Sequence, residues 1–177
     1  MATIPKNIIR FVLLVLIQAL VLDHIRLHQM ITPYIYFLFI LWLPFRINRT
    51  LLMILAACLG FAIDSFRHHP GFHMAACVLI AYLRPFIINL LISQEDGEAN
   101  YDEPSVKSMG GLLPYSIYAG ILSLLHNAWL FLLEAWQFGD AWYFISKTVL
   151  STLVTLALIL LAELVVNRKQ KFRTNTA

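Results

Sequence analysis

Charged residues are scarce in this sequence of 177 residues, in which Asp, Glu, Lys and Arg together make up 13%. Soluble domains carry about 25% charged residues. This chain is instead 60% hydrophobic and has a mean hydropathy of +0.74. Too little polar sequence remains for a separate soluble domain, so any activity lies within a bilayer or in short loops. The composition predicts one integral membrane domain over residues 1–177.

Cysteine and catalytic motifs are also scarce. Cys58 and Cys77 are the only cysteines and lie in apolar runs, which favours small buried side chains over a disulfide framework. The sequence contains no Gly-x-Ser-x-Gly, His-Glu-x-x-His or Walker motif. We therefore expect no enzyme and no cofactor. The net charge of +3 is modest and lies in loops and at the chain end, so it does not predict nucleic-acid binding.

What the sequence has in abundance is long apolar runs. A transmembrane helix needs about 20 mostly apolar residues. We expect an all-α fold of about six transmembrane helices, at residues 8–25, 30–45, 50–66, 72–92, 112–136 and 142–166. The second run is short and lies between Pro33 and Pro44. It is expected to thin the bilayer, to be buried among its neighbours, or to cross incompletely. If it formed one broken span with the third run, the termini would lie on opposite sides.

The basic residues indicate an orientation for six spans. With the N-terminus inside, inner segments carry Lys6, Arg10, Arg46, Arg49, Lys107, Arg168, Lys169, Lys171 and Arg173, and outer ones carry Arg26, Arg67 and Lys147. This bias predicts that both termini are cytoplasmic. It also places the acidic loop 94–111 and the basic tail 167–177 inside, the tail as an anchor rather than a lipid-binding segment. Aromatic residues near the proposed interfaces, such as Tyr34, Tyr36, Trp42 and Trp142, are interpreted as anchors.

Potential metal ligands gather after the third span, at Asp64, His68, His69 and His73. Pro70–Gly71 breaks any helix there, so the His-x-x-x-His geometry of a helical zinc site cannot form. A zinc site built by the loop stays open as a minority alternative. The favoured interpretation is a tight outer turn, with Asp64 reaching water or Arg67 three residues later. No metal site is therefore predicted.

Polar residues also interrupt two later spans. His126, Asn127 and Glu134 lie in an apolar run, where a proton relay, a ligand pocket and helix-helix contacts are all open. Because Asn127 and Glu134 are seven residues apart they share a face, and hydrogen bonding between helices is the favoured interpretation. Arg84 precedes a proline, which predicts a local bend with a buried or snorkelling cation. Glu163 is a possible partner for it.

The order of several segments resembles the rod shape-determining protein MreD family. "GFAIDSF", a short turn with a glycine and "FHMAACVLIAYLRPFIINLL" are similar to its third and fourth spans. "ITPYIYFLFILWLPF" and "LLHNAWLFLLEAW" also resemble it, so the likeness covers most of residues 8–166. Gly60 and Asp64 match the Gly-x-x-x-Asp pattern of the family. The resemblance implies a six-helix fold similar to the substrate-binding component of energy-coupling factor transporters.

The resemblance further implies a non-enzymatic scaffold in the bacterial inner membrane that binds MreC and helps to position peptidoglycan synthesis and control cell shape. Other members of that machinery are RodA, a class B penicillin-binding protein and MreB. The polar positions expected to fix helix packing or to bind a partner are Gly60, Asp64, Arg84, His126, Asn127 and Glu134. One alternative is a small-molecule uptake subunit, for a vitamin or a metal, with an outer pocket near Asp64 and Trp136. Another is a proton or ion pathway through His126 and Glu134.

Overall fold

The computed structural model describes residues 3–24, 31–67, 71–91, 104–134 and 141–173. Five long helices dominate this part of the chain: α1 (Thr3–Leu20), α3 (Arg49–Arg67), α4 (Phe72–Leu91), α5 (Leu112–Glu134) and α6 (Ala141–Arg173). A 3-10 turn at Leu22–His24 follows α1, and α2 (Leu38–Trp42) is a short helix. The apolar runs in all five long helices are long enough to cross a membrane. The chain is thus an all-α multi-pass membrane protein of about six helices, as predicted.

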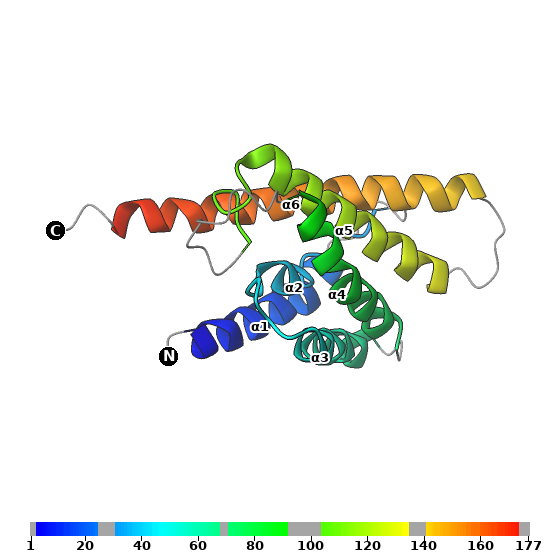
Figure 1. Ribbon diagram of the computed structural model, residues 1–177. Helices are drawn as coiled ribbons and strands as arrows, with labels where there is room; N and C mark the ends of the chain where they lie inside the picture. The colour runs from blue at the N-terminus through cyan, green and yellow to red at the C-terminus, as the bar shows by residue number, and fades with distance from the viewer. Residues whose placement is uncertain (1–2, 25–30, 68–70, 92–103, 135–140, 174–177) are drawn as a thin grey trace.

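Successive long helices from α3 onward pack side by side and run in opposite directions (Figure 1). The start of α1 and the end of α6 consequently lie at the same end of the bundle, on the left in Figure 1. We call this the basic end, because Lys6, Arg10, Arg46, Arg49 and Lys107 belong to the segments that meet there. The other end is called the histidine end, because it holds His73 and His126. Helix α6 continues through residues 167–173, so this part of the predicted basic tail prolongs the last helix, and residues 174–177 lie outside the described residues.

Helices α1 and α3 run in the same direction, which requires the chain between them to return through the bundle. Arg67, the last residue of α3, bonds Asp23 just beyond α1, so the two helices finish at the same end. The return is made by residues 31–47, called here the broken crossing. It begins near α6, where Thr32 N donates to Ser151 Oγ at 3.2 Å, and finishes beside α4, where Arg84 donates to the Pro44 carbonyl.

Only Leu38–Trp42 is helical within the broken crossing, so the prediction of a transmembrane helix at 30–45 is wrong as to its form. Proline is the physical reason. Pro33 disfavours a helical conformation at the residue before it, and Pro44 ends the short helix that precedes it. The expectation that this run is buried among its neighbours is confirmed. Tyr36 and Phe37 are 0% exposed. Irregular backbone is tolerated at membrane depth only where protein surrounds it or where it lines a cavity.

Side chains from the surrounding helices bond the first, non-helical part of the broken crossing, residues 31–36, called here the extended half, as Leu38–Trp42 is called the helical half. Gln18 on α1 accepts from Ile35 N at 2.9 Å and donates to the Pro33 carbonyl at 3.2 Å. Thr155 on α6 accepts from Tyr34 N at 3.2 Å. Because an unpaired peptide group costs free energy in a dry interior, these polar residues are a requirement of the fold.

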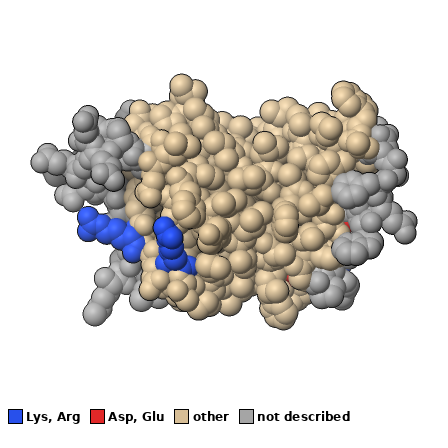
Figure 2. All heavy atoms as spheres, turned by 45° about the vertical axis from the view of Figure 1, so that its right-hand side comes forward, with Lys and Arg blue, Asp and Glu red and all other residues tan. Residues whose placement is uncertain are grey.

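The outer faces of the long helices are apolar. Phe61, Leu90 and Leu113 are 65%, 80% and 72% exposed, although each is strongly hydrophobic. On the face shown in Figure 2, uncharged side chains cover a broad area, and the Lys and Arg side chains that are visible lie near one edge. Such a surface suits contact with lipid tails or with the apolar spans of other proteins.

Candidate functional site

A chain of hydrogen-bonded polar side chains runs into the core from the histidine end. Its first members are Asp23 and Arg67, which form an ion pair with Nη2···Oδ1 and Nε···Oδ2 distances of 2.5 and 2.8 Å. Both side chains keep some contact with the surface, being 14% and 21% exposed. Arg67 also lies over the Tyr34 ring, 5.0 Å from its centroid, and donates to its hydroxyl at 3.1 Å. The predicted contact of Arg67 with Asp64 is thus replaced by a pairing with Asp23.

The centre of the chain is a tyrosine hydroxyl between two imidazoles. Tyr36 Oη lies 2.8 Å from His73 Nδ1 and 2.7 Å from His126 Nε2. The other nitrogen of His73, Nε2, lies 3.3 Å from Arg67 Nη1. All three rings are at most 1% exposed. Three different elements, the broken crossing, α4 and α5, therefore meet at this hydroxyl.

Beyond His126 the chain passes to α6. His126 Nδ1 lies 3.2 Å from Asn127 Oδ1, and Asn127 Nδ2 donates to Thr152 Oγ1 at 3.1 Å. The polar chain is defined here as Asp23, Arg67, His73, Tyr36, His126, Asn127 and Thr152. It connects α3, α4, α5 and α6 to the extended half of the broken crossing. The interpretation of Asn127 as a residue that bonds between helices is confirmed.

The donors at the Arg67 end fix the direction of every hydrogen bond in the polar chain. Arginine only donates, so His73 Nε2 accepts and the proton of the neutral ring sits on Nδ1. His73 then donates to Tyr36, whose hydroxyl has one proton and gives it to His126 Nε2. His126 in turn carries its proton on Nδ1 and donates to Asn127 Oδ1. Each link has one donor and one acceptor, with both histidines neutral.

Aromatic rings enclose this centre. Phe37 stacks on His126, with ring centroids 4.4 Å apart and an interplanar angle of 27°. Tyr34 presents its edge to both imidazoles, at centroid distances of 5.5 and 5.8 Å. Tyr34 and Tyr36 were predicted to be interface anchors, and that prediction is wrong because both are buried in the core. Trp142, at 75% exposed, agrees with an anchor.

Asp64 also lies near the histidine end, but it caps a helix and does not belong to the polar chain. Its carboxylate accepts from the backbone N–H groups of Gly71, His73 and Met74, at 3.1, 3.0 and 3.0 Å. It therefore caps the start of α4 from the end of α3, where the unbonded N–H groups of a helix favour a negative charge. Gly71 supports the turn with a φ of 95°. His68 and His69 lie outside the described residues.

Gly60 allows the two helices to approach closely at the same level. A Cβ atom on Gly60 would lie 2.3 Å from Met74 Cα, too close for any side chain. The Gly-x-x-x-Asp pair thus makes one packing unit: the glycine admits α4, and the aspartate caps it. This close packing also positions His73, the neighbour of Met74, to meet Tyr36.

A second polar cluster holds the helical half of the broken crossing at the basic end. Arg84 is 1% exposed; its Nε donates to Tyr118 Oη at 3.0 Å, and its Nη2 donates to the Leu43 carbonyl. Tyr118 in turn donates to the Leu41 carbonyl at 3.2 Å. Of the two predicted alternatives, a buried or a snorkelling cation, the structure shows the buried one.

Glu163, the acid that the sequence offered as a partner for Arg84, also binds the broken crossing. It accepts from Trp42 Nε1 at 2.9 Å, and from the Tyr115 hydroxyl at 3.3 Å. Its other oxygen accepts from Val106 N at 3.2 Å. The buried acid and the buried base therefore act at the same end of α2, the acid on the Trp42 indole and the base on the carbonyls of Leu43 and Pro44 just beyond it.

Glu134 does not belong to the polar chain. It bonds Lys147 at 3.3 Å, with side chains 31% and 19% exposed, and so ties the end of α5 to α6 at the surface. His126 lies eight residues earlier, which is about 12 Å along the helix. The structure therefore does not bring together the two residues of the predicted ion pathway. Among the described residues, no three His, Cys, Asp or Glu side chains are grouped to hold a metal ion.

Sequence reasoning did not find Gln18 and Tyr36 as core residues, or Asp23 as the partly exposed partner of Arg67. A usable signal was present for Gln18 and Asp23, since a polar side chain near the end of an apolar run often faces the protein interior. For Tyr36 the sequence carried no such signal, because tyrosine is common both at membrane interfaces and in hydrogen-bonded cores.

Comparisons with protein-family models, curated proteins and solved structures found no match to this chain. The likeness to MreD and the expected similarity to a transporter component therefore stay predictions.

Proposed function

We propose that this protein is a non-enzymatic membrane scaffold subunit. The observation that carries the proposal is the use of its interior polar groups: Asp64, His126 and Asn127 each bond another part of the same bundle. Arg84 does the same at the opposite end. Side chains committed in this way order the helices. A scaffold needs such internal order, and it leaves the apolar outer faces for binding.

The partner that fits is another membrane protein with an apolar span. The exposed large hydrophobic residues on the long helices offer lateral surface for it, and the resemblance names MreC, a single-span protein. RodA, a class B penicillin-binding protein and MreB would then be members of the same assembly. An inner-membrane location with both termini cytoplasmic is supported by the five membrane-length helices plus the broken crossing, which together make an even number of crossings, and by the basic residues at the end where α1 begins and α6 ends.

Co-purification tests this proposal. The chain and the MreC homologue from the same genome are expressed together with separate tags and extracted in mild detergent, with an unrelated single-span protein as the matched control. We expect the homologue, but not the control, to be recovered with the chain and to elute with it from a sizing column. Failure to recover the complex, with both proteins well expressed and in nanodiscs as well as detergent, would contradict the proposal.

A small-molecule uptake subunit is a second candidate, favoured by the broken crossing. Interrupted spans near the centre of a bundle mark substrate sites in many transporters. Such a protein would retain a vitamin or a metal through purification, which native mass spectrometry and elemental analysis detect. Preparations free of both, from cells supplied with both, would remove this candidate.

A further inference from the structure

A lateral groove opens between α1 and α3 at the basic end, with the broken crossing as its floor. It has a volume of about 580 Å³ and is lined by Asn7, Ile8, Phe11, Phe39, Leu43, Pro44, Arg46, Ile47, Leu51 and Leu55. This volume falls in the range of about 300–1,000 Å³ that is typical of ligand pockets. Neither the polar chain nor the Arg84 and Glu163 cluster lines the groove.

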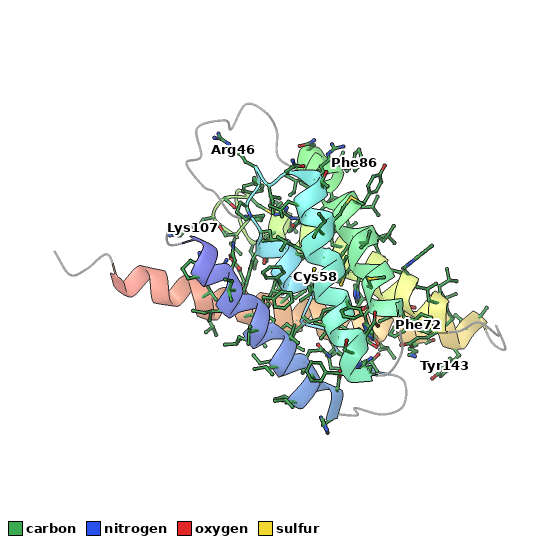
Figure 3. The ribbon with its side chains drawn as sticks, turned by 90° about the horizontal axis from the view of Figure 1, so that it is seen from below. Arg46, Cys58, Phe72, Phe86, Lys107 and Tyr143 are labelled. Atoms are coloured by element: carbon green, nitrogen blue, oxygen red, sulfur yellow. The ribbon has the colours of Figure 1, made fainter. Side chains whose placement is uncertain are left out.

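The groove has an apolar part and a polar part. Its deeper part presents Phe11, Phe39 and Leu55, whereas Asn7 and Arg46 are its two side chains with polar heads. Figure 3 shows Arg46 and Lys107 at one end of the bundle and Phe72 and Tyr143 at the other. The polar mouth of the groove therefore lies at the basic end.

Positive charge predominates around that mouth. None of the ten described lining residues is acidic. Arg10, on α1 beside the lining residue Phe11, lies over the Trp42 ring at 5.0 Å from its centroid, so its guanidinium group is held in place nearby. The groove thus offers an apolar slot with a cationic entrance.

We propose that this groove binds one anionic phospholipid. The acyl chain lies along Phe11, Phe39 and Leu55, and the phosphate lies at the mouth, where Arg46 and the Asn7 amide face it. Charge complementarity selects this occupant: the cationic mouth favours a phosphate with a net negative headgroup. A partner helix, about 10 Å across with its side chains, would cover such a slot rather than fill it.

Lipid retention tests the proposal. The purified protein is exchanged into detergent with phosphatidylglycerol or phosphatidylcholine of identical acyl chains, and bound lipid is counted by native mass spectrometry. We expect one phosphatidylglycerol to be retained in preference. Arg46→Gln should weaken its retention about fivefold, the effect of one basic side chain near an anionic surface. Arg49→Gln, which removes the same charge away from the groove lining, is the matched control and should retain it.

A second pair of variants tests the apolar part. Leu55→Trp fills the groove and should reduce retention of both lipids, whereas Ile54→Trp, on the neighbouring outward position with 55% exposure, should not. Thermal unfolding of each variant confirms that the fold is intact. Equal retention of the two lipids by the unaltered protein would overturn the proposal, and so would retention unchanged by Arg46→Gln. A cross-link from Leu51 to a partner span in place of lipid would overturn it as well.

Discussion

The two halves of the broken crossing are held by different chemistry. Thr32–Tyr36 is non-helical and ends in a turn, and hydroxyl, amide and imidazole groups hold it. Leu38–Trp42 is helical, and a buried arginine and a buried glutamate hold it. Extended backbone has no hydrogen-bond partners of its own, so it needs many neutral ones from neighbouring helices. A helix pairs its interior groups and leaves unpaired groups only at its ends, and Arg84 donates to the carbonyls of Leu43 and Pro44 just beyond the end of α2.

The largest effect on stability is expected from removing the buried cation that holds the helical half. Arg84→Met keeps much of the volume but leaves the Leu43 carbonyl and the Tyr118 hydroxyl without their donor. We expect the free energy of unfolding to fall by about 3–5 kcal/mol, because each buried acceptor left unpaired costs about 1–3 kcal/mol. Denaturant titration in detergent micelles measures it.

Arg49→Met is the control for this substitution, because Arg49 is exposed and lies over a ring at the surface. We expect a loss below about 1 kcal/mol there. Equal losses in the two variants would show that the helical half is not held by its buried cation.

The next effect concerns the packing that supports the extended half. Gly60→Ala places a methyl group where Met74 Cα lies 2.3 Å away. Helices α3 and α4 would have to separate, which moves His73 away from Tyr36. We expect a loss of about 2–3 kcal/mol. Gly120→Ala is the matched control, since its nearest neighbour, Leu156 Cδ2, lies at an ordinary 3.7 Å. A loss in the control as large as that of Gly60→Ala would remove the special role of the α3–α4 contact.

A smaller effect is expected from the centre of the polar chain. Tyr36→Phe keeps the ring and removes the hydroxyl that joins the two imidazoles. Each imidazole loses one neutral hydrogen bond in a dry core, so we expect a loss of about 2 kcal/mol. Tyr82→Phe, at a position 53% exposed, should change the unfolding free energy little. Stability unchanged by Tyr36→Phe would mean that neutral links do not hold the extended half.

The same centre makes a spectroscopic prediction. If Arg67 fixes the direction of the chain, His73 and His126 are both neutral with their proton on Nδ1. Nitrogen-15 spectra of labelled histidine, assigned with His73→Gln and His126→Gln variants, distinguish this tautomer from the one protonated on Nε2. A proton on Nε2 of either ring would refute the ordering.

The sequence predicts the long helices well because apolar length alone determines them. It also locates the irregular second run, since Pro33 and Pro44 limit its helix. It does not predict which core groups meet: Arg67 and Asp23 are 44 residues apart, and Tyr36 and His126 are 90 apart. Apolar helices give no pattern that specifies these neighbours. Asp64 was therefore expected to reach Arg67, whereas it caps the start of α4. Gly60 and Asp64 were found as a pair only through the resemblance to a family whose pattern joins two residues four positions apart.

The smallest expected effect comes from a charge outside both halves. Glu134 and Lys147 form an ion pair at 3.3 Å with both side chains partly exposed. Water screens such a pair, so Glu134→Gln should cost less than about 0.5 kcal/mol, measured in the same titration as Arg84→Met. Raised salt should reduce even this difference, and it should leave the Arg84→Met effect unchanged because Arg84 is buried. A loss from Glu134→Gln comparable to that from Arg84→Met would show that location, buried or exposed, does not decide the value of a charge in this bundle.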